Sequence, residues 1–224
     1  MKAVLVWLAS GALLFLNISC VNQAVGSTPA TILTPSVTGS PPVITSIPPM
    51  SDSTLTFDFD SGLLRGKGTP LEQTVGGITA SFSSPSDPGA FSIQRQETTF
   101  LPITNFSGNY LFQNSIFPTR LIIRFSKPLT QIQFSFATMD SHSTGEADIP
   151  TTLRLTAYEN STKTSMAGIA TAMGTFANEA YPQGLLSFGT DDRNFDTIEL
   201  ELIRQPRGTS IFHLDNIVVV VSGK

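Results

Sequence analysis

The stretch LIIRFSKPLTQIQFSF, residues 121–136, carries the alternation of apolar and polar residues that decides the fold class. Every second residue from Ile132 to Phe136 is apolar, and the residues between them are Gln or Ser. A period of two places alternate side chains on opposite faces of a strand, so one face is buried and the other is solvated. The same period runs from Leu121 to Phe125, and Lys127–Thr130 lies between the two runs as a predicted turn. The stretch therefore predicts a β-hairpin.

Similar patterns recur along the rest of the chain. Strands are expected at 54–60, 75–83, 91–95, 108–113, 153–157, 165–176, 184–188, 198–202 and 211–221. Residues 165–176 would also suit a helix because they are rich in Ala and Met, but Gly168, Gly174 and several Thr residues favour a strand. About ten strands with turn-rich connections predict an all-β fold, a single β-sandwich or jelly roll.

The N-terminus has the pattern of an export signal. Lys2 is followed by an uncharged apolar run from Ala3 to Leu16, which is short for a transmembrane helix. The run ends close to Ser19-Cys20, which resembles a bacterial lipobox although Asn17 departs from it, and Cys20 is the single cysteine of the chain. We therefore expect residues 1–19 to be a lipoprotein signal peptide and Cys20 to carry lipid; the alternative is an ordinary secretory signal.

A linker follows the lipidated residue. Residues 20–53 are dominated by Ser, Thr and Pro, and this composition is typical of stalks rather than of packed cores. Fully extended, such a linker reaches roughly 100 Å. Residues 54–224 form the predicted β-sandwich domain. The expected location is extracytoplasmic, at the cell surface or in the periplasm, with the lipid holding the protein to a bacterial membrane.

Charge and motifs exclude several functions. The net charge is −4 and Lys and Arg are not clustered, which argues against a nucleic-acid partner. The sequence contains neither a metalloprotease His-Glu pattern nor a nucleophile elbow, and the pair Glu146 and Asp148 is best explained as a solvated loop. We therefore expect no catalytic residues and no enzymatic activity.

Four segments together resemble the jelly-roll domains of bacterial exported proteins. They are FDFD (57–60), GGITASF (76–82), LIIRFSKPLTQIQF (121–134) and FHLDNIVV (212–219). These domains are similar in kind to galactose-binding-like folds and to carbohydrate-binding modules, and many relatives carry a PEP-CTERM sorting tail. This chain stops at Lys224 without such a tail, so the N-terminal lipid would be its anchor.

The resemblance also implies a structural calcium ion. In similar carbohydrate-binding modules, acids at places that correspond to Asp58, Asp60 and Asp215 hold Ca²⁺ through oxygen ligands. The alternative is that Asp58 and Asp60 face solvent and that Asp215 caps a turn or a bulge.

The leading hypothesis for function is a non-catalytic domain that binds carbohydrate or another cell-envelope partner. The alternatives are a structural or adhesion protein without a small ligand and, less favoured, a glycan-active hydrolase. A sugar site needs an exposed aromatic ring beside polar groups. Because Trp7 lies in the signal peptide, the candidate ligand-binding residues are Tyr158 and Tyr181, with Asn160 close by. The alternative for each Tyr is a half-buried ring.

Overall fold

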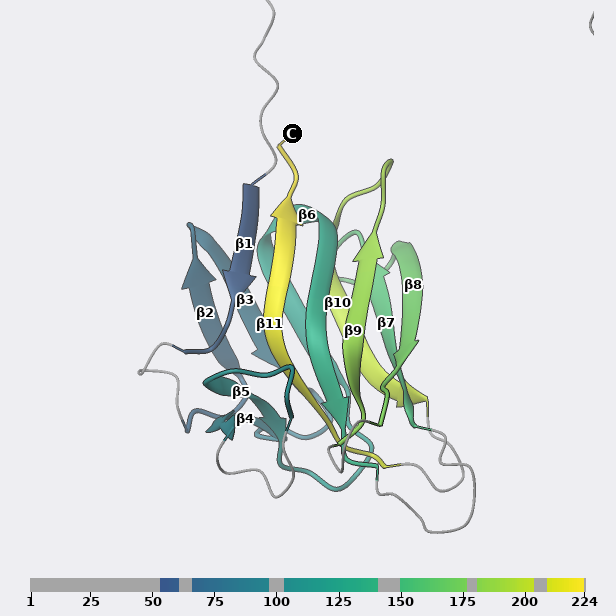
Figure 1. Ribbon diagram of the computed structural model, residues 1–224. Helices are drawn as coiled ribbons and strands as arrows, with labels where there is room; N and C mark the ends of the chain where they lie inside the picture. The colour runs from purple at the N-terminus through teal and green to yellow at the C-terminus, as the bar shows by residue number, and fades with distance from the viewer. Residues whose placement is uncertain are drawn as a thin grey trace, which may run out of the picture. The chain divides into compact units, whose positions relative to one another are not determined.

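The computed structural model describes residues 53–60, 66–96, 103–140, 150–176, 181–203 and 209–223 (Figure 1). These residues form eleven strands, and the pairs that they make are antiparallel. The strands are β1 (Ser53–Phe57), β2 (Leu71–Val75), β3 (Ile78–Ser83), β4 (Phe91–Arg95), β5 (Asn109–Gln113), β6 (Leu121–Thr138), β7 (Thr152–Tyr158), β8 (Met166–Met173), β9 (Gln183–Gly189), β10 (Phe195–Ile203) and β11 (Phe212–Val221). The predicted all-β sandwich is confirmed. Within the described residues, no helix is long and apolar enough to cross a membrane.

The long strand β6 corrects the predicted hairpin at 121–136. It runs unbroken for 18 residues and passes from one layer of the sandwich to the other. Its first half pairs with β3 and β10, whereas its second half pairs with β9 and β11. The change of layer takes place around Pro128, where the pairing with β10 is irregular. A proline suits this irregular point because it has no backbone N–H that could donate to a neighbouring strand. Its carbonyl still accepts a hydrogen bond from the Ser222 N–H (3.0 Å).

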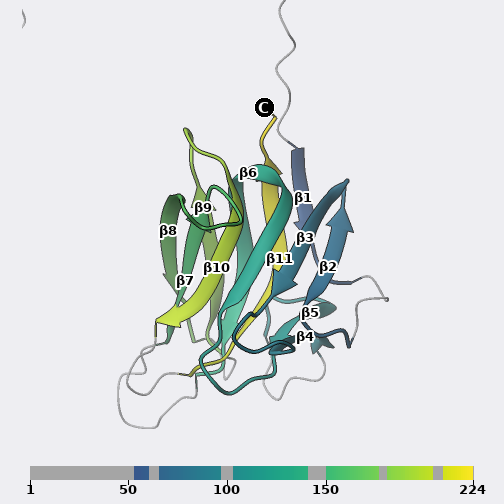
Figure 2. The same ribbon diagram turned by 180° about the vertical axis from the view of Figure 1, so that it is seen from behind.

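The two layers share β6. One layer contains β2, β3, β6, β10, β7 and β8, and the other contains β4, β5, β11, β6 and β9. Strand β1 pairs with β11 from Ser53 opposite Val221 to Phe57 opposite Ile217, so the first and last strands lie side by side. Figure 1 shows β11 and β9 in front, and Figure 2 shows β10 and β3 from behind.

The core between the layers is rich in phenylalanine. Phe57 packs edge-on against Phe125, and Phe59 does the same against Phe82, with ring centroids 5.9 and 5.4 Å apart. Each fully buried Phe side chain contributes about 2–3 kcal/mol through the hydrophobic effect. This core follows from the alternation in the sequence, because every second residue of such a strand is apolar and lies on the inner face.

Two weaker expectations have clear outcomes. Residues 166–173 form a strand, as predicted, and not a helix. The predicted strand 75–83 is β3 together with a tight turn at Gly76 and Gly77, whose φ angles of 55° and 76° allow a two-residue hairpin to β2.

Candidate functional site

The outward face of β7 presents the predicted Tyr158. Leu153, Leu155 and Ala157 of this strand are fully buried, and Tyr158 lies on the opposite, partly exposed face. The Lys163 ammonium lies 5.7 Å from the centre of the Tyr158 ring, within the range of a cation–π contact. The structure therefore gives Tyr158 a ring on the outer surface, next to a positive charge.

Asn160 holds the turn that follows β7. Its side-chain oxygen accepts hydrogen bonds from the Thr162 hydroxyl (2.6 Å) and from the backbone N–H of Thr164 (3.4 Å). The turn places Lys163 in the left-handed region, with φ of 57°. Asn160 thus positions Lys163 beside Tyr158, and its predicted contact with a ligand stays a prediction.

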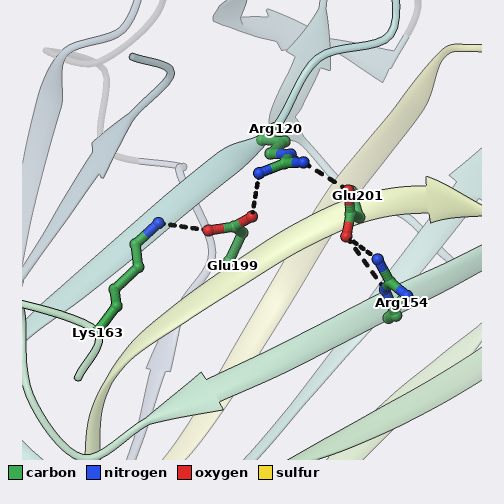
Figure 3. Close-up of polar contacts among 5 residues, drawn as sticks. All are labelled: Arg120, Arg154, Lys163, Glu199 and Glu201. Carbon is green, nitrogen blue, oxygen red and sulfur yellow. Dashed lines mark hydrogen bonds and ion pairs between the residues drawn. The ribbon is translucent and has the colours of Figure 1, made fainter. Parts of the chain in front are cut away.

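A network of five charged side chains crosses the same face, and we call it the polar ladder (Figure 3). Its members are Arg120, Arg154, Lys163, Glu199 and Glu201. Arg120 bridges the two acids through its Nη1 to Glu199 (3.1 Å) and its Nε to Glu201 (3.2 Å). Lys163 also pairs with Glu199, and Arg154 pairs with Glu201.

The ladder follows from strand register. Glu199 and Glu201 alternate with the buried Ile198 and Leu200 on β10, and Glu201 lies opposite Arg154 on β7. The pattern at 198–202 predicted a strand, but the two acids were not predicted to be site residues. Partners on other strands can be found only when the register is known, which is why the network was missed.

Within the ladder, the two acids are less exposed than the two arginines. The Glu199 side chain is 8% exposed, whereas those of Arg120 and Arg154 are 62% and 40% exposed. The Glu201 carboxylate raises the pKa of the Arg154 guanidinium above its ordinary value, chiefly through their hydrogen bond. Three cations and two anions leave the ladder with one excess positive charge, and the two arginines keep guanidinium N–H groups open to solvent.

Tyr181 occupies a different environment from Tyr158. It is 7% exposed and packs with Ile103, Phe106 and Tyr110 in a second apolar cluster, separate from the main core. Burial raises the pKa of its phenol. The structure does not bring Tyr181 and Tyr158 together, and it leaves Tyr181 little exposed surface for stacking on a sugar.

The three predicted calcium ligands, which we call the aspartate cluster, lie in the region where β1, β5 and β11 meet, without being grouped closely. Asp58 and Asp60 come directly after β1 and are exposed, and Asp215 is fully buried on β11. The Asp60 carboxylate accepts a hydrogen bond from the N–H of Asn109 (2.7 Å), and Asp215 accepts one from the N–H of Ser107 (2.9 Å).

Asp215 lies in an electrostatically unfavourable position. Burial raises the pKa of its carboxyl to about 7, hydrogen bonds from Ser107 and Asn216 oppose this rise, and the charges of Asp60 and Asp58 add to it. The pairing of β11 with β6 shifts register just after Asp215, and Asn216 has φ of 51°. Asp215 thus also stands at a bulge, as the alternative explanation expected.

The donor chemistry of the aspartate cluster fits calcium in part. Carboxylate oxygens are the ligands that Ca²⁺ prefers, and no Lys or Arg among the described residues forms an ion pair with these three acids. In the described part of the chain, however, no three acidic, His or Cys side chains are grouped as they would be around a metal ion. Carbonyl oxygens or water would have to supply much of the shell.

Several predicted features lie outside the described residues. They are the signal peptide at 1–19, Cys20 with almost all of the 20–53 linker, and the pair Glu146 and Asp148.

Comparisons with known proteins give likenesses of fold. No protein-family model matches the chain, and no curated protein sequence matches it. The K1 cleaved adhesin domain of Lys-gingipain from Porphyromonas gingivalis W83 is similar at 10% identity and a TM-score of 0.43, covering 76% of this chain and 99% of that one.

Two other similar structures are carbohydrate-binding modules. The xylan-binding module CBM86 from Roseburia intestinalis has 10% identity and a TM-score of 0.31, with 76% of this chain and 96% of that one covered. The CBM22-1 xylan-binding domain of Xyn10C from Paenibacillus barcinonensis has 11% identity and a TM-score of 0.34, with 77% and 97% covered. At these identities and TM-scores the likeness concerns the fold alone.

Proposed function

We propose that this domain is a non-catalytic carbohydrate-binding module whose ligand lies across the outer face of β6, β10 and β7. The observation that carries the proposal is the position of Tyr158 beside the polar ladder. A sugar presents C–H groups on its ring faces and hydroxyl groups at its edge, so it needs an aromatic face and oriented polar groups together.

The ladder supplies the oriented polar groups. Glu199 and Glu201 fix the guanidinium planes of Arg120 and Arg154, so little side-chain entropy remains to be lost when a ligand binds. The same ion pairs argue against catalysis by these two acids. Glycosidases use one carboxyl group as a proton donor and the other as a nucleophile or base, whereas each acid here is held by two cations.

The experiment is a glycan array probed with the full chain, followed by titration calorimetry with each glycan that binds. We expect a dissociation constant between about 1 µM and 1 mM, or roughly 4–8 kcal/mol. Tyr158→Ala should weaken binding at least tenfold, and Tyr158→Phe, which keeps the ring, should retain most of it. Full affinity in a folded Tyr158→Ala variant would refute the assignment to this face. Turnover of any polysaccharide in a parallel panel would refute the non-catalytic part.

We also propose that the aspartate cluster binds a structural Ca²⁺ ion. The supporting observation is the buried Asp215 carboxyl, which burial chiefly, and the charges of Asp60 and Asp58 to a smaller extent, make costly to ionise; a bound cation would relieve this cost. A ligand that binds only the folded state raises its stability, so 1 mM CaCl₂ should raise the melting temperature relative to EGTA. Asp215→Asn should abolish the difference, and MgCl₂ is the matched control for ionic strength. An identical melting temperature of the wild type in calcium and EGTA would contradict the proposal.

Attachment to a membrane through Cys20 is the third part of the proposal. It is supported by the apolar run before a single cysteine. Metabolic labelling with palmitate should mark the wild type and leave Cys20→Ser unlabelled. A wild type that is never labelled would refute lipidation and leave an ordinary secretory signal.

A further inference from the structure

The connection between β5 and β6 exposes two neighbouring apolar side chains. Ile116 is 72% exposed and Phe117 is 70% exposed, the two highest values among the large apolar residues that the structure describes. Neither side chain is part of the hydrophobic core. Exposed aromatic groups of this kind are typical of binding surfaces.

A buried glutamine fixes the backbone that carries them. Gln113 is 1% exposed, and its amide nitrogen donates to the carbonyls of Ser115 (2.8 Å) and Phe117 (3.2 Å). The Thr119 hydroxyl donates to the same Phe117 carbonyl (3.1 Å). The Gln113 amide oxygen accepts from the N–H of Phe212 on β11 (3.2 Å), which joins the loop to the sheet. The Phe117 backbone is therefore held in place before any ligand binds.

A cavity of about 550 Å³ lies beside Phe117, and we call it the loop pocket. One wall is the 86–90 turn with Asp87, and the other is the loop from Asn114 to Thr119. Asn114 ties the walls together, since its N–H donates to the Ala90 carbonyl (2.7 Å) and its side-chain amide to the Gly89 carbonyl (3.2 Å). The volume is within the usual range for small-ligand sites, about 300–1,000 Å³.

We propose that the loop pocket binds a neutral sugar unit. Phe117 would cover an apolar face of the sugar ring, and the Asp87 carboxylate would accept hydrogen bonds from its hydroxyl groups. Among the described residues, no side chain forms a hydrogen bond or ion pair with that carboxylate, so its oxygens are available to a ligand. The inference rests on the proposed carbohydrate binding and adds a second site to it.

The loop pocket adjoins the polar ladder. A smaller cavity of about 250 Å³ is lined by Arg120 and Glu201 of the ladder, and Pro118 and Thr119 line both cavities. One glycan chain that reaches from Tyr158 past Arg120 to Phe117 would therefore contact both sites.

The chemistry of the lining favours a sugar over a protein or a membrane. The loop pocket combines one aromatic ring with hydroxyl, amide and carboxyl groups. Ile116 is as exposed as Phe117 but does not line the cavity. A protein or membrane that recognised the apolar tip would use both side chains, whereas a sugar in the pocket would use Phe117 alone.

This difference gives the test. The full chain is titrated with methyl glycosides of glucose, galactose, mannose and xylose, and with their hexasaccharides where available, by saturation-transfer NMR and calorimetry. Phe117→Ala should weaken binding at least tenfold, Phe117→Trp should restore it, and Ile116→Ala should stay within twofold of the wild type. Equal losses in Phe117→Ala and Ile116→Ala, or no loss in a folded Phe117→Ala variant, would overturn the inference.

The outcome separates the two proposals. If Tyr158→Ala removes binding while Phe117→Ala does not, the proposed function is supported and sugar binding in the loop pocket is refuted. The opposite result supports the loop pocket and refutes binding on the outer face. If the wild type binds none of the sugars, both are refuted.

Discussion

One buried histidine, His213 on β11, should make a contribution to the free energy of unfolding that falls as the pH falls. Its ring is fully buried, stacks on Phe112 with centroids 4.5 Å apart and meets Tyr110 edge-on at 5.6 Å. Its Nδ1 accepts a hydrogen bond from the N–H of Gln113 (3.2 Å), which makes Nε2 the protonated nitrogen of the neutral ring. Among the described residues, Nε2 has no hydrogen-bond partner.

Burial lowers the pKa of His213 from 6.5 to about 3 in the folded protein. Between these two values the unfolded chain binds a proton that the folded chain does not, so stability falls as the pH falls. The loss of unfolding free energy that His213 causes is small at pH 7 and reaches about 3 kcal/mol at pH 4. This is a large share of the roughly 5–15 kcal/mol that is typical of a domain.

Urea denaturation at pH 7, 6, 5 and 4 measures this effect when the wild type is compared with His213→Phe. The variant keeps an aromatic ring on Phe112 but loses the acceptor for the Gln113 N–H, so it should be less stable at pH 7 by about 1–3 kcal/mol. The difference between the two proteins should shrink, and then reverse or vanish, toward pH 4. Asp215 titrates with the opposite sign in this range and is present in both proteins, so it largely cancels in the comparison. Parallel pH curves for the two proteins would refute the reasoning.

Two other predictions concern stability, and a third concerns the ladder. In thermal melts, Gly108→Ala should destabilise the protein by about 2–4 kcal/mol, because a Cβ there would stand 1.9 Å from an Asp60 carboxylate oxygen. Gly66→Ala is the control: Gly66 has a similar positive φ but open space around it, so the cost should be about 1–2 kcal/mol. Asp140→Ala should cost about 3 kcal/mol or more in urea denaturation, because four hydrogen bonds to its carboxylate are lost. Arg120→Ala should weaken glycan binding in calorimetry more than it lowers stability, because its side chain is 62% exposed.

The sequence was most informative where a strand has one buried face. The bounds expected for 91–95 match β4, and those for 108–113 and 184–188 differ from β5 and β9 by only one or two residues. Apolar periodicity is a local property, so the existence of these strands could be predicted. It does not show which strands are neighbours. The 127–130 segment has the composition of a turn, yet β6 continues through it because both of its halves find partners, one set in each layer.

The candidate sites were predicted less well, for a related reason. Tyr158 was placed correctly on the outward face because the alternation along β7 is regular. Tyr181 lies before β9, where no periodicity applies, and only the tertiary structure shows that it packs with Phe106 and Ile103. The sequence did not predict Phe117 as a binding residue, because a phenylalanine is more often part of a core.

Three buried polar side chains, Gln113, Asp140 and Gln183, belong to segments that meet where β6 stops and β9 and β11 begin, which is the lower end in Figure 1. Gln113 holds the loop that carries Phe117, Asp140 joins the end of β6 to the start of β7 and to the segment before β11, and Gln183 accepts hydrogen bonds from Thr104 and Asn105. Each buried amide or carboxyl group adds less stability than an apolar side chain of the same size, but it fixes the backbone around it. At the opposite end, the contact between Pro128 and Ser222 is a backbone hydrogen bond. The loop that carries Phe117 thus lies about 30 Å along β11 from Ser53, where the described chain begins.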